Sequence, residues 1–280
     1  MSQAAHAAAE RPGPTALRLY GRFVSQSIRA QIQYRLSFLL MAVGHFVTSV
    51  VEAIGIWALF ERFGMLGQWT LAQVAFLYGI VNVAFPVSEA LARGFDVFGA
   101  QFVKTGDFDR LLLRPRSTVL QLAGHDFQLQ RIGRLAQGLI VLGWAIVALD
   151  LDWDPARVAL LLYTVLSAVV FFYALFIFQA TLSFWTVDSL EIMNTLTYGG
   201  VETAQYPLAI YRPGFRRFFT FVVPLGCISY FPAVALLGIE DPLGTGRAVQ
   251  VAAPLAGYAF FALSLATWRA GIRHYTSTGS

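Results

Sequence analysis

The sequence predicts an all-α polytopic membrane protein with six transmembrane helices. Of its 280 residues, 57% are hydrophobic and only 13% are charged, and the mean hydropathy is +0.60. A soluble protein of this size could not bury so much apolar side chain in one core. Apolar runs near the length of a bilayer-spanning helix recur along the chain. The alternating segments of a transmembrane β-barrel are missing.

The N-terminal part is predicted to precede the first span without entering the bilayer core. Residues 1–14 have no apolar stretch before Arg11, so they do not form a cleaved signal peptide, and we expect a disordered cytoplasmic segment. Residues 15–35 have the pattern of an amphipathic helix lying in the headgroup plane. The alternative is an ordinary solvated amphipathic helix. The apolar face comprises Leu17, Tyr20, Val24, Ile28 and Ile32, and the polar face comprises Arg18, Arg22, Gln26, Arg29 and Gln33.

The transmembrane domain is predicted to extend over residues 36–270, followed by a cytoplasmic tail at 271–280. Four spans are read directly from apolar runs, and a last one follows near the C-terminus. Two segments, 187–208 and 217–238, compete for the fifth span: the second is more apolar but contains Pro224 and Pro232. The other spans are expected at 36–60, 71–92, about 132–149, 158–185 and 249–268.

The distribution of basic residues predicts the orientation. With six spans and the fifth at 217–238, the 20 Lys and Arg residues divide into 17 on the side of the N-terminus and 3 on the other side. With the fifth span at 187–208, the division is 14 to 6. Both divisions place the two termini and the loop after the second span in the cytoplasm. Topology therefore explains the net charge of +4, and no nucleic-acid partner is expected.

The loop at 93–117 concentrates charged residues, glycine and proline in an otherwise apolar chain. Phe95, Phe98 and Phe102 follow the spacing of a short amphipathic helix along 93–103. The residues alone leave two interpretations open. The loop is either a solvated connection whose basic residues keep it on the cytoplasmic side, or a docking element for a cytoplasmic partner.

Enzymatic and metal-binding signatures are not found. The phosphate-binding loop G-x-x-x-x-G-K-[ST] needs a lysine, and the single lysine, Lys104, follows Val103 rather than glycine. The four histidines are scattered, so we expect no metal site, and a G-x-S-x-G nucleophile turn is absent. Cys227 is the only cysteine, which rules out an internal disulfide. The chain itself is predicted to be non-catalytic and to hold no cofactor.

Three ionisable residues fall within predicted spans: His45 and Glu52 on the first and Glu89 near the end of the second. Ionisable groups are costly in a bilayer, so they face a cavity or a partner. They form either hydrogen bonds between helices or a polar wall of a translocation pathway, and the two alternatives have equal weight. Tyr173, Trp185 and Tyr198 are equally ambiguous between membrane-interface anchors and substrate contacts.

Several stretches together resemble the membrane subunits of export-type ABC transporters. They include "LFERFGMLGQWTLAQVAFLYG", "EALARGFDVF", "GDFDRLLLRPRS", "FWTVDSLEIMNTLTYGGVETAQYPLAIY" and "RRFFTFVVPLGCISYFPAVALLG". The chain is similar, more narrowly, to a bacterial subfamily of six-span permeases often encoded as two unlike subunits beside an ATPase gene. The resemblance covers about residues 17–270 and depends on the order and spacing of these stretches rather than on one motif.

The resemblance implies an ATP-driven exporter in the bacterial inner membrane. It implies a coupling loop within 93–117 that docks on a dimeric ATP-binding subunit, which holds ATP and Mg²⁺, and a second permease, like or unlike. It also favours 187–208 as span five and roughly 212–238 as a re-entrant hairpin. The implied coupling residues are Phe98, Phe102, Gly106, Asp107, Leu111, Leu112, Arg114 and Pro115. An ion-gradient-driven secondary transporter is the alternative, but no convincing internal repeat supports it.

Overall fold

A computed structural model describes residues 16–186 and 190–276, and the regular elements among them are helices. The predicted N-terminal segment 1–14 and the last residues of the predicted tail lie outside the described residues. The elements are α1 Ala16–Gln33, α2 Arg35–Phe63, α3 Leu71–Asp96, η1 Gly99–Val103, α4 Asp107–Leu112, α5 Thr118–Ala123, η2 Leu129–Arg131, α6 Ile132–Ala148, α7 Pro155–Leu182, α8 Leu190–Ala204, η4 Leu208–Ile210, α9 Pro213–Arg217, η5 Phe218–Val222, α10 Leu225–Ile228, α11 Tyr230–Leu237, α12 Arg247–Ala252 and α13 Leu255–Ile272.

Four of the described helices are long and apolar enough to cross a membrane. They are α2, α3 together with η1, η2 together with α6, and α7, and they correspond to the first four predicted spans. The predicted fifth span corresponds to α8, whose described part has 15 residues, and residues 187–189 lie outside the description. The predicted last span corresponds to α12 and α13, which Ala253 and Pro254 separate. An all-α polytopic membrane protein is thereby confirmed, while the count of six spans stays a prediction.

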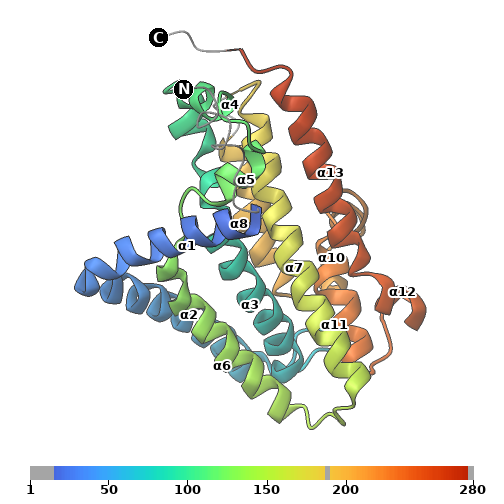
Figure 1. Cartoon of the computed structure of the whole chain (residues 1–280). Coiled ribbons are helices and arrows are strands. Elements are labelled where there is room, and N and C mark those ends of the chain that lie inside the picture. Colours follow the sequence, from blue (N-terminus) through green and yellow to red (C-terminus); the bar gives the residue numbers. More distant parts are fainter. Residues whose placement is uncertain (1–15, 187–189, 277–280) are drawn as a thin grey trace, which may run out of the picture.

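Helices α3 and α7 form the centre of the molecule (Figure 1). Helix α6 packs on α3 and carries α2 on its other side, whereas α13 packs along α7. Both central helices begin with a side-chain cap. The Thr70 hydroxyl accepts from the Gln73 amide at 3.4 Å, and Asp154 accepts from the Arg157 amide at 2.6 Å immediately before Pro155. Caps of this kind satisfy amide groups that a helix leaves unpaired at its start.

Close approach between spans depends on small residues of α6. A Cβ atom at Gly138 would lie 2.5 Å from the carbonyl oxygen of Asn82 on α3, and one at Gly133 would overlap the backbone of Ala42 on α2. Backbone cannot move aside as the end of a flexible side chain can. Glycine therefore lets three helices touch along their backbones, a common way to pack helices in lipid.

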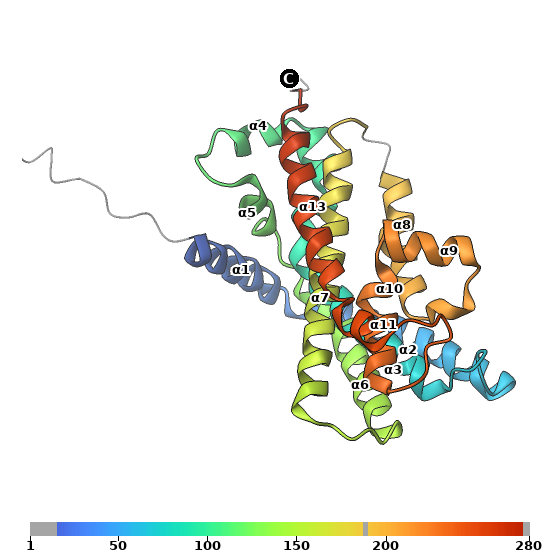
Figure 2. The same cartoon turned by 90° about the vertical axis from the view of Figure 1, so that its right-hand side faces the viewer.

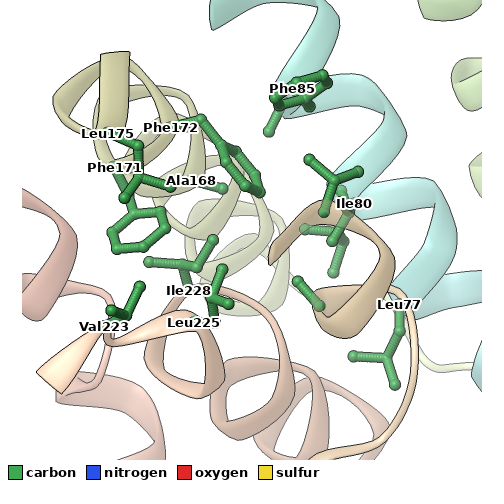
Figure 3. Packing of buried hydrophobic residues seen from close by; sticks show 14 of the residues in the cluster. Leu77, Ile80, Phe85, Ala168, Phe171, Phe172, Leu175, Val223, Leu225 and Ile228 are labelled. Carbon is green, nitrogen blue, oxygen red and sulfur yellow. The ribbon is translucent and has the colours of Figure 1, made fainter. Parts of the chain in front are cut away.

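The segment after α8 is a broken helix. The helical stretches Pro213–Val222 and Leu225–Leu237 meet at a bend of 69°. Pro224 lies at the break, where its missing N–H removes a helical hydrogen bond. Leu225 and Ile228 of α10 pack against Phe171 and neighbouring apolar residues of α7 and α3 (Figure 3). Because irregular backbone is tolerated in a membrane only where protein or water shields it, this packing fits the expected broken hairpin.

The expected separate amphipathic helix at 93–103 is wrong. Helix α3 continues through a π-helical turn to Val103, giving one helical stretch of 33 residues from Leu71. The reason is packing: Phe95, Phe98 and Phe102 are buried among other helices instead of lying on a surface. The second predicted span was therefore ended too early, at the first charged residues after it.

Candidate functional site

The loop between α3 and α5 folds onto the ends of the central helices. Gly106, with a φ of 73°, turns the chain between η1 and α4 in a left-handed conformation that favours glycine. Helix α4 then crosses the end of the molecule at which α13 also ends (Figure 2). Its exposed face carries an ion pair of 3.1 Å between Arg110 and Asp107. The α6–α7 turn lies at the opposite end (Figure 2).

An aromatic cluster beneath α4 joins this loop to three long helices. The ring of Phe98 is fully buried and lies 5.0 Å from Phe108 of α4, 5.3 Å from Phe184 after α7 and 5.1 Å from Trp268 of α13. Tyr275, after α13, lies 4.9 Å from Phe108. Edge-on contacts of this kind add to the stability from burial alone. The cluster is therefore a packed joint between α4 and the ends of α3, α7 and α13.

The residues implied in coupling separate into two groups. Phe98 and Phe102 are buried and form no part of the exposed surface, and their implied role in coupling stays a prediction. Leu111 is half-buried and packs against the core. Gly106 and Asp107 are also half-buried. The exposed group at the tip of the loop comprises the implied residues Leu112, Arg114 and Pro115. Leu113, which is 85% exposed, and Arg116 lie beside them, although the sequence did not single these two out.

The base of this exposed tip is fixed by hydrogen bonds. The side-chain amide of Gln121 on α5 donates to the carbonyl oxygen of Leu111 at 3.1 Å and to that of Arg116 at 3.2 Å. The indole nitrogen of Trp268 donates to the Thr118 hydroxyl at 3.1 Å. The tip is thus held at both ends to α5, which is itself bound to α13.

The neighbouring His125 extends the same region. Its ring lies 4.8 Å from Phe102. Burial lowers the pKa of His125 below its usual value, and Arg93 lowers it further, while Asp126 acts in the opposite direction. The neutral imidazole is therefore favoured next to the aromatic cluster.

A second site, within the spans, brings together all three ionisable residues that the sequence singled out. The Arg131 guanidinium lies 2.7 Å from Glu89 Oε1 and 3.4 Å from His45 Nε2. Arg134, one turn later, donates to Asn82 at 2.9 Å and lies 3.8 Å from Glu52. We call these six residues the intramembrane polar cluster. Its elements are α2, α3, η2 and α6.

Tyrosines of α3 and α8 border the intramembrane polar cluster. The Tyr198 hydroxyl donates to Glu89 at 3.3 Å, so Tyr198 contacts the cluster directly. The Tyr78 hydroxyl donates to the carbonyl oxygen of Ser49 at 3.2 Å and to Gln137 at 3.5 Å. Each hydroxyl thus links its own helix to neighbouring helices by hydrogen bonds.

Arg131 and Arg134 were missed by sequence reasoning, which singled out no basic residue at the start of span three. The signal that could have found them is their spacing with Gln137. Positions i, i+3 and i+6 put these three polar residues on one face of an otherwise apolar helix. Two basic residues on one face need carboxylates opposite, and Glu52 and Glu89 supply them.

The sequence matches the family described as ABC-2 family transporter protein over residues 46–279. The chain belongs to the ABC-2 transporter family. The resemblance to ABC transporter permeases is thereby confirmed, and the protein is a multi-pass membrane component of an ABC transporter. Comparison with curated proteins and with solved structures yields no match.

Membership in this family implies that the ABC-2 permease works with an ATPase subunit. Among residues 16–186 and 190–276, no three His, Cys, Asp or Glu side chains are placed to hold a metal ion together.

Proposed function

We propose that this ABC-2 permease is one half of an ATP-driven exporter. It pairs with a second permease, like or unlike, and with a dimeric ATP-binding subunit that holds ATP and Mg²⁺. It lies in the inner membrane of a bacterium with both termini in the cytoplasm. The distribution of Lys and Arg supports this orientation.

The packed joint under α4 carries the proposal. A loop that served only to connect two spans would gain little from a buried core of its own. Here Phe108 of α4 is fully buried against Phe98, Phe184 and Tyr275. Because such a close-packed interior transmits strain, displacement of α4 would move the ends of α3, α7 and α13 together. This is the mechanical property that a coupling element requires.

The exposed tip has the chemistry of a docking surface. The Leu113 side chain is exposed and lies between Leu112 and the basic Arg114. A second basic residue, Arg116, follows after Pro115. We infer that the ATPase offers an apolar pocket for Leu113 with acidic groups at its rim. Buried apolar anchors surrounded by polar rims are typical of protein interfaces.

A charge placed at this anchor tests the proposal. In the full chain co-expressed with its ATPase, Leu113→Asp should lower the ATPase recovered with the tagged permease about tenfold or more, because a buried carboxylate would lack a partner. Met65→Asp is the matched control, since Met65 is also exposed but lies in the α2–α3 turn. ATPase recovery and ATP hydrolysis are measured for both variants. Normal recovery and hydrolysis with Leu113→Asp would place docking elsewhere.

A further inference from the structure

Helix α8 exposes polar residues although it lies among membrane-spanning helices. Asn194, Tyr198 and Glu202 are exposed and follow one another at intervals of four residues, which puts them on one face of α8. A helix surface that contacts hydrocarbon is apolar, because polar groups there lose their hydrogen bonds with water. This face is therefore directed toward water or toward protein.

Charged residues of two other helices belong to the same surface. Glu202 is an electrostatic neighbour of Glu52 on α2 and of Arg134 on α6. Tyr198, on the exposed face, donates to Glu89 behind it. The exposed face of α8 is thus continuous with the intramembrane polar cluster, and we call the combined surface the acidic wall.

The acidic wall has an excess of negative charge. Glu52, Glu89 and Glu202 stand against two guanidinium groups, those of Arg131 and Arg134. The two guanidinium groups pair with two of these carboxylates: Arg131 lies 2.7 Å from Glu89, and Arg134 lies 3.8 Å from Glu52. The third carboxylate, that of Glu202, is exposed and forms no ion pair with another described residue.

Buried acceptor atoms of the acidic wall lack donors. Glu89 is 3% exposed, and its Oε2 has no hydrogen-bond partner although its Oε1 binds Arg131 and Tyr198. Glu52 Oε2 and Arg134 Nη2 are both buried without a hydrogen bond, because the 3.8 Å between them allows an ion pair but is too long for a hydrogen bond. Buried carboxylate oxygens of this kind favour a cation or a strong donor.

We propose that the acidic wall binds a cationic group of the transported molecule, with Glu52 and Glu202 as its charged contacts. This inference rests on the proposed export function and adds the class of substrate, a lipophilic amine or quaternary cation. The Tyr198 ring, which packs edge-on against Phe85 at 5.7 Å, supplies an aromatic surface next to the carboxylates. Aromatic faces attract cations, and the attraction increases where water is excluded. An anion of similar shape would be repelled by the unbalanced charge.

Two hydrophobic ions of nearly equal size and opposite charge provide the test. Tetraphenylphosphonium and tetraphenylborate are titrated against the full chain in lipid nanodiscs, and their affinities are compared at constant salt. The wild-type chain should prefer the cation beyond its preference in empty nanodiscs. The double variant Glu52→Gln, Glu202→Gln should lose about tenfold or more of this preference, because both charged contacts are removed.

The control variant is Glu240→Gln, which removes an exposed charge from the α11–α12 turn. An equal loss of preference in this control, or an unchanged preference in the double variant, would overturn the proposal. Loss of association with a second permease and no change in ion preference would also overturn it, and would identify the wall as an interface between permeases. Because binding is measured without ATP, these outcomes are independent of ATPase recruitment by Leu113. If Leu113→Asp lowers ATPase recovery as expected but the double variant keeps its ion preference, only the cation site is refuted.

Discussion

The joint under α4 and the intramembrane polar cluster both connect several helices, but by opposite means. The joint is made of aromatic rings centred on Phe98, with neutral side chains that need no charged partner. The polar cluster is made of charges that neutralise one another, such as Arg131 and Glu89 at 2.7 Å. Ring packing spreads its stabilisation over many weak contacts, whereas paired charges in a low-dielectric interior penalise separation strongly. The contrast suits a joint that moves as a unit and a cluster that fixes the positions of spans.

The largest effect is expected at the centre of the joint. Phe98→Asp should prevent stable folding, because it removes a fully buried ring and places a carboxylate among apolar groups. Monodisperse protein recovered from membranes, followed by size-exclusion chromatography in detergent, measures this. Leu113→Asp introduces the same charge 15 residues later on the exposed tip and should give a normal elution profile. Normal recovery of Phe98→Asp would mean that its ring is exposed after all.

A smaller but more specific effect is expected in the polar cluster. Arg131→Gln should lower the free energy of unfolding by about 3–5 kcal/mol, because the buried Glu89 carboxylate would lose its ion-pair partner. The double variant Arg131→Gln, Glu89→Gln should recover much of this loss, since the unpaired charge is then gone. The coupling energy follows from thermal unfolding of the four proteins of the cycle. Strict additivity of the two single changes would show that the ion pair does not form.

The smallest effect is expected in the turn after α11, outside the spans. Burial alone would raise the pKa of Asp241. Hydrogen bonds from the hydroxyls of Thr245 and Tyr230 and from the amides of Leu243 and Thr245 outweigh it and hold the pKa below its usual value. The folded pKa is below the unfolded one, so this stabilisation is present above about pH 4 and is lost as the pH falls through the folded pKa.

Asp241→Asn should therefore lower the free energy of unfolding by about 1–2 kcal/mol near neutral pH, because a charged carboxylate accepts stronger hydrogen bonds than a neutral amide does. The loss should be smaller in acid, where the wild-type carboxylate is protonated too. Thermal unfolding from pH 7 to pH 3 measures the difference between the variant and the wild type. Glu240→Gln, next to it and exposed, should shift stability very little over that range. A difference that stays constant with pH would mean that Asp241 keeps its ordinary titration in the folded protein.

The same contrast explains where sequence reasoning about the sites succeeded. His45, Glu52 and Glu89 could be identified because an ionisable residue inside an apolar span is conspicuous in the sequence. The role of Phe98 and Phe102 could not be identified in this way. An aromatic residue at helical spacing has the same pattern whether its face meets solvent, a partner or its own protein. Only the positions of Phe184 and Trp268, far along the chain, decide that these rings are buried.

The sequence by itself determined the all-α membrane class and four spans, because bilayer thickness sets the length of an apolar helix and hydropathy reports it directly. It also indicated the break at Pro224, where proline cannot donate a backbone hydrogen bond. Tertiary structure alone decided that α3 continues to Val103, since burial of three phenylalanines outweighs the charges nearby. It alone decided that Arg131 and Arg134 meet Glu89 and Glu52, because those pairings join residues of separate helices, and the position of one helix relative to another is set by packing rather than by local pattern.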